Sequence, residues 1–325
     1  MLSTNQGNRM ATVICCPTEA PTRTAREGAH SKDRMNAIEI DYHLVIDPVS
    51  TPNRRCAHGD TVLLPSDVEF RRLRPALGTF VAISGRAADE AIVQRAIAAA
   101  FGAFALVNDR MHPTHVRSDL TSIRESRVGC AVAVHLWTWE VLNWSQRLNA
   151  MSSGRFDPCV PESRGRIFDI DLPAPGTLVC KVPVVIDLGG VAKGFAVDRA
   201  IDALMAAECS EGQINAGGDV RCFGPAASTI WLRVAGCARP ISLRNSACAV
   251  SDPARISAPS EHRGYYGPPG TAAAPVGGRA AIVVAPTAMV ADSLTKCVVL
   301  AGNASDRGDL ETLLHRLGAT SLEIT

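Results

Sequence analysis

Apolar residues recur along this chain at steps of three and four over several long stretches, a spacing that predicts amphipathic helices. The clearest apolar stripe lies over residues 87–111, and a second one, which includes Trp137 and Trp144, lies over residues 131–151. Both stripes indicate helices that pack against a core, which is the ordinary place for the two tryptophans. Shorter helices are expected over three further ranges: 191–207, 290–300 and 306–317.

Short apolar runs that end in turn residues predict strands. Strands are expected over 69–85, over 182–188, over 211–224 around a pair of glycines, over 230–244 as a hairpin, and over 280–285. Residues 252–279 are rich in Pro, Gly, Ala and Tyr and are expected to form a loop. Because helices and strands alternate without a regular βαβ series, the predicted fold class is α+β (mixed α/β).

The length of 325 residues and the 46% hydrophobic content suit one large domain or two ordinary ones. Residues 1–65 are polar, contain several Pro and Arg, and lack an apolar core of signal-peptide length. We therefore expect a poorly ordered or mis-started N-terminal extension over 1–65, followed by one folded domain over 66–325. With no signal peptide visible, the sequence suggests the cytoplasm but leaves the compartment open.

The balance of charges excludes some partners. A formal charge of +1 offers no broad basic field for nucleic acid or for an anionic membrane surface. No window reaches the roughly 18 uninterrupted apolar residues of a membrane helix, so no transmembrane segment is expected. Any anion must therefore be recognised locally, by a few placed groups.

The 11 cysteines are scattered, odd in number and without CxxC spacing. In a chain of this length that pattern predicts reduced, mostly buried thiols rather than a disulfide framework. His and Cys do not cluster at metal-ligand spacing, so a transition-metal centre is not expected.

The segment 187–198 carries the strongest chemical signal, and it reads DLGGVAKGFAVD. A strand-like run ends in Asp187, passes through two glycines and opens a helix with Lys193 in its first turns. Glycines permit close approach of the backbone, and a helix N-terminus presents N–H groups, so the segment suits an anionic ligand. Taken alone, Lys193 is equally consistent with a solvated helix lysine. Asp198 is interpreted as a structural or capping partner.

A second candidate lies near the C-terminus. Asp292 is expected to start a helix, with Thr295 three residues later on the same face. A carboxylate and a hydroxyl so placed can ligate one hard cation such as Mg²⁺. From spacing alone, helix capping by Asp292 is the favoured interpretation.

These segments resemble the ApbE family of FAD:protein FMN transferases, over roughly residues 71–305. The resemblance extends to four further short segments: LGTF at 77–80, SDL at 118–120, SGRFDP at 153–158 and NAGGDV at 215–220. It implies a T-fold-like molecule of two lobes with the flavin nucleotide held between them.

The resemblance also implies roles for particular residues. The residues implied to bind the flavin nucleotide are Leu77, Arg155, Phe156, Asp157, Asp187, Lys193, Asn215, Gly217 and Gly218. The implied magnesium ligands are the main-chain carbonyl of Gly190 and the side chains of Asp292 and Thr295. Catalytic roles fall to Asp292, Lys193 and Asp187.

The implied reaction transfers the FMN moiety of FAD to a threonine hydroxyl of an acceptor flavoprotein, a subunit of a redox complex, and releases AMP with the help of Mg²⁺. Two departures from the family pattern bear on this activity. Lys296 stands where the family often has a hydroxyl residue, and residues 264–269 replace a His-Ile-x-Asp-Pro segment. A family member that binds FAD without transferring it is therefore the alternative.

Two other classes of function are disfavoured by missing motifs. The chain lacks the GxGxxG fingerprint after a strand, which disfavours a flavin-dependent oxidoreductase. It also lacks GxxxxGK[ST], which disfavours a P-loop phosphohydrolase.

Overall fold

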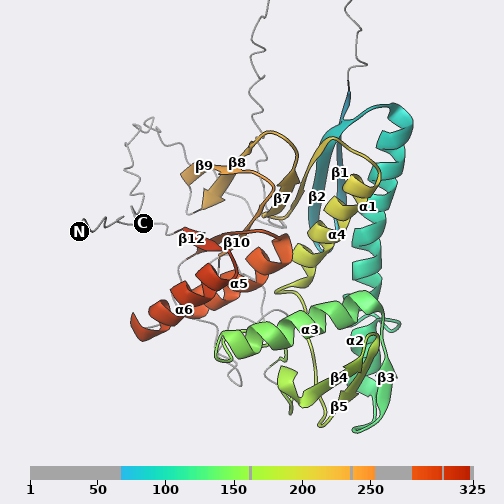
Figure 1. The fold of residues 1–325 in the computed structure, drawn as a ribbon. Helices are drawn as coiled ribbons and strands as arrows, with labels where there is room; N and C mark the ends of the chain where they lie inside the picture. Colours follow the sequence, from blue (N-terminus) through green and yellow to red (C-terminus); the bar gives the residue numbers. More distant parts are fainter. Residues whose placement is uncertain (1–66, 161–162, 235–236, 253–279, 302–303, 323–325) are drawn as a thin grey trace, which may run out of the picture. The chain divides into compact units, whose positions relative to one another are not determined.

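The computed structural model describes residues 67–160, 163–234, 237–252, 280–301 and 304–322 (Figure 1). The expected extension over 1–65 and the expected loop over 252–279, except Asp252, lie outside these described residues. The fold of the described part is mixed α and β, as predicted, and it is built on a seven-stranded antiparallel sheet. In the order in which they pair, its strands are β1 (Val68–Ala76), β2 (Thr79–Ala87), β6 (Glu211–Ala216), β7 (Asp219–Phe223), β10 (Ala247–Ser251), β11 (Ala281–Ala285) and β12 (Thr320–Leu322).

Three helices cover one face of this sheet: α1 (Glu90–Met111), α4 (Ala192–Ala206) and α5 (Ala288–Leu300). Helix α4 lies between the other two and contacts both, as well as β6 and β7 (Figure 1). The main hydrophobic core fills the space between these helices and the sheet. The helices predicted over 87–111, 191–207 and 290–300 are thus confirmed, as is the last one, α6 (Ala304–Arg316).

By length and composition alone, α1 could cross a membrane, a test that core helices of soluble proteins also pass. Nine of its residues are buried and belong to the main core, so packing against the sheet and α4 accounts for its apolar character.

The opposite face of β7, β10 and β11 is covered by the hairpin of β8 (Ser228–Val234) and β9 (Cys237–Leu243), where a hairpin over 230–244 was predicted. Side chains alternate along β10, since Cys248 belongs to this second core whereas Ala247 and Ala249 belong to the main one. Ser251, two residues after Ala249, therefore faces the helices. This alternation places its hydroxyl beside α5.

A smaller three-stranded sheet pairs β3 (Ala131–Ala133) and β4 (Ile170–Ala174) with β5 (Thr177–Cys180). The same part of the chain contains three helical segments: α2 (Asp119–Glu125), α3 (Leu136–Met151) and the short 3₁₀ helix η1 (Ile167–Asp169). The prediction of one continuous helix over 131–151 is therefore wrong at its start. His135 caps α3 by accepting a hydrogen bond from the amide of Trp137, which separates the helix from the strand before it.

Two predicted strands differ from the structure. The range 69–85 is a hairpin, because Leu77 and Gly78 both take positive φ angles, of 49° and 70°, and turn the chain. The range 182–188 is not a strand, and its only β-bridge joins Ile186 to Cys159. Pro183 has no amide to donate to a ladder, which explains the failure of that prediction. The strands predicted over 211–224 and 280–285 are confirmed.

Candidate active site

Helices α4 and α5 meet at Gly194. Its amide donates a hydrogen bond of 3.1 Å to Oδ2 of Asp292, which lies in the second turn of α5. A Cβ at Gly194 would lie 2.8 Å from Cβ of Asp292 and would overlap the carbonyl of Ala288. Only glycine permits this close approach, and the structure thereby brings the segment 187–198 and Asp292 together.

The sequence predicted that Asp292 starts this helix, α5, and that prediction is wrong. The helix begins at Ala288, and its N-cap is Thr287, whose hydroxyl accepts from the amide of Val290. Asp292 therefore does not cap its own helix, and its carboxylate instead accepts from the amide of Gly194 in the first turn of α4. Its side chain points inward with no exposed surface.

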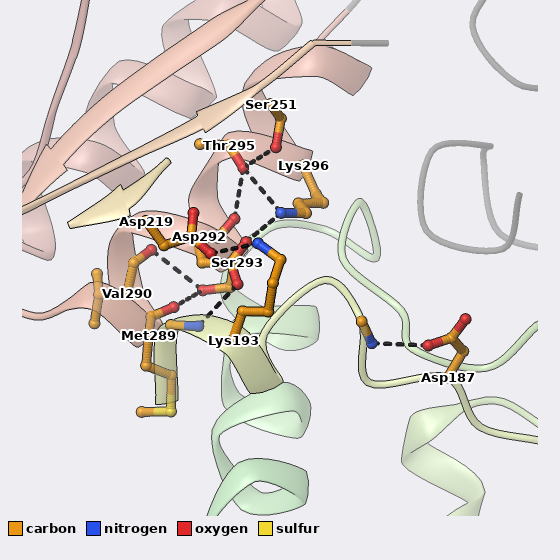
Figure 2. A network of polar contacts seen from close by, with 12 residues as sticks. Asp187, Lys193, Asp219, Ser251, Met289, Val290, Asp292, Ser293, Thr295 and Lys296 are labelled. Atoms are coloured by element: carbon orange, nitrogen blue, oxygen red, sulfur yellow. Dashed lines mark hydrogen bonds and ion pairs between the residues drawn. The ribbon is translucent and has the colours of Figure 1, made fainter. Parts of the chain in front are cut away.

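Asp292 belongs to a network of polar side chains that we call the buried cluster (Figure 2). It consists of two acids, two lysines and two hydroxyl residues: Asp219, Asp292, Lys193, Lys296, Ser251 and Thr295. These residues come from α4, α5, β7 and β10, so the cluster forms only when the helices pack on the sheet.

Two ion pairs dominate the cluster. The ammonium of Lys193 lies 2.5 Å from Oδ2 of Asp219, and the ammonium of Lys296 donates to Oδ1 of Asp292. The side chains of Asp219, Asp292 and Lys296 are at most 4% exposed, whereas that of Lys193 is 30% exposed. Lys193 is thus the member of the pairs that reaches solvent.

Burial affects the two carboxyl groups differently. Burial, together with the negative charge of Asp292, raises the pKa of Asp219 to about 6, against the opposing effect of Lys193 and Lys296. Burial by itself would raise the pKa of Asp292 too, but the ammonium groups of Lys296 and Lys193 and the Gly194 amide hold it below its ordinary value. Asp292 is therefore the carboxylate that stays ionised.

The hydroxyl of Thr295 is fully engaged. It donates to the main-chain carbonyl of Asp292 at 2.6 Å, and it lies 2.6 Å from Oγ of Ser251 and 3.2 Å from Nζ of Lys296. A hydroxyl has one proton and two lone pairs, and three partners use all of them. The residues present therefore do not fit Mg²⁺ in the predicted way, because Lys296 already contacts both predicted side-chain ligands. Gly190, the third predicted ligand, is buried two residues ahead of α4.

A cavity of about 760 Å³ adjoins the buried cluster at Lys193. Four of the predicted site residues line it: Leu77, Asp187, Lys193 and Gly217. Oδ1 of Asp187 accepts a hydrogen bond of 2.8 Å from the amide of Gly189, which orders the loop ahead of α4 (Figure 2). The polar part of the cavity wall thus combines the acid Asp187, the basic residues Lys193 and Arg124, His112 and glycine backbone.

The amides at the start of α4 are mostly satisfied within the protein. The amides of Val191 and Ala192 both bond to the carbonyl of Leu188, and that of Gly194 bonds to Asp292. The helix N-terminus is therefore less open to an anion than the glycine pattern predicted. The charge of Lys193 is the stronger attraction for a phosphate.

The turn between β6 and β7 consists of Gly217 and Gly218, with φ angles of 62° and 104°. The side chain of Asn215 closes it by accepting from the amide of Gly218 at 3.1 Å. A Cβ at Gly217 would lie 2.6 Å from Oγ1 of Thr79, so the turn packs tightly against the first residue of β2. The turn positions Asp219 to pair with Lys193.

The predicted segment 155–157 lies apart from the cavity wall. Phe156 is buried in the main core, and Asp157 is buried with its carboxylate accepting from the amide of Cys159. Arg155 donates to the carbonyl of Ser152 and lies 3.8 Å from Asp309. The structure does not bring these three side chains to the cavity.

Ser251 was not predicted as a site residue, and the burial of the Lys296 side chain was not predicted either. Ser251 precedes an Asp-Pro pair in the sequence, but only the alternation of β10 reveals that its hydroxyl faces inward. The direction of Lys296 was left open. Its spacing of four residues from Asp292 on one helix is the signal that predicts the pair.

Comparisons with known proteins agree with this fold. The crystal structure of the flavinyl transferase ApbE of Pseudomonas stutzeri in its apo form is 16% identical, with a TM-score of 0.66, over 78% of this chain and 90% of that one. The ApbE protein of Thermotoga maritima is 21% identical, with a TM-score of 0.68, over 78% and 94% of the two chains. The flavin transferase ApbE of Vibrio cholerae is 20% identical, with a TM-score of 0.64, over 79% and 93%.

At these identities the structural likeness concerns the fold. A comparison with curated protein sequences gives no significant match. The sequence profile of the ApbE family, however, matches residues 77–315, which span both the cavity and the buried cluster. The chain therefore belongs to the ApbE family.

Proposed function

We propose that this protein transfers the FMN moiety of FAD to a threonine hydroxyl of an acceptor flavoprotein, a subunit of a redox complex, and releases AMP. The observation that carries the proposal is the cavity of about 760 Å³ whose wall holds Lys193 and Asp187 in a chain of the ApbE family. Its size suits a bound flavin nucleotide.

The cavity wall divides into an apolar part and a polar part. The apolar part suits a flavin ring, and it consists of Leu77, Val107, Met111, Val160, Val185, Ile186 and Ala192. The polar part suits a diphosphate, since Lys193 brings positive charge and Gly189 and Gly217 allow close approach of the backbone. We place the phosphates beside Lys193 and the ring against the apolar wall.

The proposed reaction is a phosphoryl-type transfer. The threonine oxygen of the acceptor forms a bond to the phosphorus on the riboflavin side of FAD, and the bond from that phosphorus to the bridging oxygen breaks. AMP leaves with the bridging oxygen and its electron pair, and the hydroxyl proton passes to a base. Asp187 is the candidate base, since its carboxylate lines the cavity. Lys193 stabilises the charge on the phosphates.

The test is a transfer assay with a redox-complex subunit that normally carries threonine-linked FMN, produced without its own transferase. Incubation with FAD is expected to give a fluorescent acceptor band and an equal amount of AMP. Replacing the acceptor threonine by valine should abolish both products. Lys193→Met should lower the rate by about 100-fold or more, as for loss of one transition-state donor. Lys181→Met, at an exposed lysine, is the matched control.

The alternative is a family member that binds FAD without transferring it, which Lys296 and the replaced segment over 264–269 favour. Stoichiometric FAD binding with no AMP release from any tested acceptor would support this alternative and contradict the proposal.

A further inference from the structure

We infer that the ammonium of Lys296 takes the place of a divalent cation beside Asp292, so that the nucleotide site of this protein is complete without a metal ion. The inference about metal binding stands on the buried cluster alone. Its extension to FAD binding rests on the proposed function.

The oxygen atoms that a cation would need beside Asp292 are already occupied. The Lys296 ammonium donates to Oδ1 of Asp292 and lies 3.2 Å from Oγ1 of Thr295. A cation between Asp292 and Thr295 would need the same two oxygens. The lone pairs of Thr295 are already used by Lys296 and Ser251, and its proton by the carbonyl of Asp292.

The charges of the buried cluster balance without a cation. The buried cluster contains two carboxylates, Asp219 and Asp292, and two ammonium groups, Lys193 and Lys296, so its formal charge is zero. A divalent cation would leave an excess of two positive charges in a region where three of the four side chains are at most 4% exposed. With a neutral residue at position 296 the same cluster would carry one negative charge and would attract a cation.

Lys296 is held firmly in its place beside Asp292. It lies four residues after Asp292 on the same helix, the spacing at which a lysine reaches a carboxylate with little strain. Its side chain is 4% exposed, so a metal could reach Asp292 only if a buried ammonium first left its carboxylate. Removing one member of a buried ion pair leaves the other charge buried and unpaired, which is strongly unfavourable.

The test uses Mn²⁺ as a paramagnetic probe, titrated without nucleotide into the full chain while free Mn²⁺ is followed by electron paramagnetic resonance. The wild type is expected to leave Mn²⁺ free. Lys296→Thr, which removes the ammonium and supplies a hydroxyl, is expected to bind one Mn²⁺ per chain at least about tenfold more tightly than the wild type. Lys181→Thr is the matched control and should behave as the wild type does.

A second measurement covers the case in which Lys296→Thr is too unstable to purify. The wild type is titrated with FAD by flavin fluorescence, once in EDTA and once in excess Mg²⁺, and its thermal midpoint is recorded in both. Equal dissociation constants and equal midpoints support the inference. A dissociation constant that rises about tenfold or more in EDTA, or one Mn²⁺ bound per wild-type chain, overturns it.

These outcomes separate the two proposals. If the wild type binds no FAD under either condition, the proposed function fails, while the Mn²⁺ titration and the thermal midpoints still decide whether Lys296 replaces a cation.

Discussion

Asp198, in the middle of α4, caps the N-terminus of α5 by accepting a hydrogen bond of 2.8 Å from the amide of Ala288. Its other oxygen accepts from the amide of Met289 at 2.9 Å, and Nη1 of Arg221 donates to the first oxygen at 2.8 Å. This confirms the interpretation of Asp198 as a structural or capping partner. The contact fixes α5, which carries Asp292, against α4, which carries Lys193.

Asp198→Ala should therefore lower the free energy of unfolding by about 3 kcal/mol, because it removes a helix cap and leaves Arg221 without its buried carboxylate. Asp202→Ala is the control on the same helix. Its carboxylate is 46% exposed, and the change should cost less than about 1 kcal/mol. Urea unfolding followed by circular dichroism measures both. Equal losses for the two variants would contradict the capping role.

Gly194→Ala tests the close approach of α4 and α5. Because the new Cβ would overlap the Ala288 carbonyl, which is backbone and cannot swing away, a loss of about 3 kcal/mol or more is expected. Gly308→Ala in α6 is the matched control, since its Cβ would meet nothing within 4 Å. At an exposed helix position that change should stabilise by up to about 1 kcal/mol. The same urea titration compares them, and a neutral Gly194→Ala would show that the helices can separate.

Much of the fold could be predicted because its long helices carry regular apolar stripes, as α1 does over its 22 residues. The failures have local causes. Leu77 turns the chain although leucine seldom takes a positive φ, and Pro183 interrupts a run that is otherwise strand-like. The first residues of the range 131–151 form a strand that pairs with β5. Pairing with a strand far away in the sequence cannot be recognised from the local spacing of apolar residues, so a helix was predicted there.

The sequence indicated which residues belong to the candidate site better than it indicated how their side chains are arranged in space. The pattern of charges and glycines pointed to Asp187 and Lys193, and the spacing to Thr295 pointed to Asp292. In the structure Lys193 both lines the cavity and belongs to the buried cluster. The direction of each side chain was harder to predict, and for Lys296 only its spacing of four residues from Asp292 indicated it. Phe156 points into the core, and Lys296 turns toward Asp292 rather than toward solvent.

Buried and exposed cysteine thiols are expected to react differently with an alkylating reagent. Burial raises the pKa of the thiols of Cys248 and Cys297 to about 12, from an ordinary 9.0, whereas Cys130 is exposed. At pH 8, iodoacetamide followed by site-resolved mass spectrometry should modify Cys130 and spare the two buried thiols until urea is added. Modification of Cys297 in the native protein at the rate of Cys130 would contradict its burial.

The same shifts determine how stability responds to alkaline pH. Between pH 9 and 12 the unfolded chain loses protons from these thiols, whereas the native chain keeps them. The native state then binds more protons, so the free energy of unfolding should fall as the pH rises past 9. Cys248→Ala should reduce this slope, and an unchanged slope would mean that the thiol titrates normally.

Asp219 is expected to make FAD binding depend on pH. Since burial raises its pKa to about 6, its carboxylate takes up a proton as the pH falls through that value. The formal charge of the buried cluster then changes from zero to +1, and Lys193 loses its ion pair with the Asp219 carboxylate. The diphosphate of FAD does not titrate in this range, so its dissociation constant should fall by about tenfold between about pH 8 and about pH 5. Flavin fluorescence titration measures this change.

Asp219→Asn isolates the cause, because the amide is neutral at every pH and cannot hold the lysine as an ion pair. This variant should bind FAD at pH 8 about as tightly as the wild type does at pH 5, with no further change on acidification. Riboflavin, which lacks phosphate, should show no pH response with either protein. If riboflavin responded as FAD does, the effect would come from the ring pocket and not from Lys193. If the Asn variant kept the full pH dependence, a group other than Asp219 would control the charge beside the phosphates.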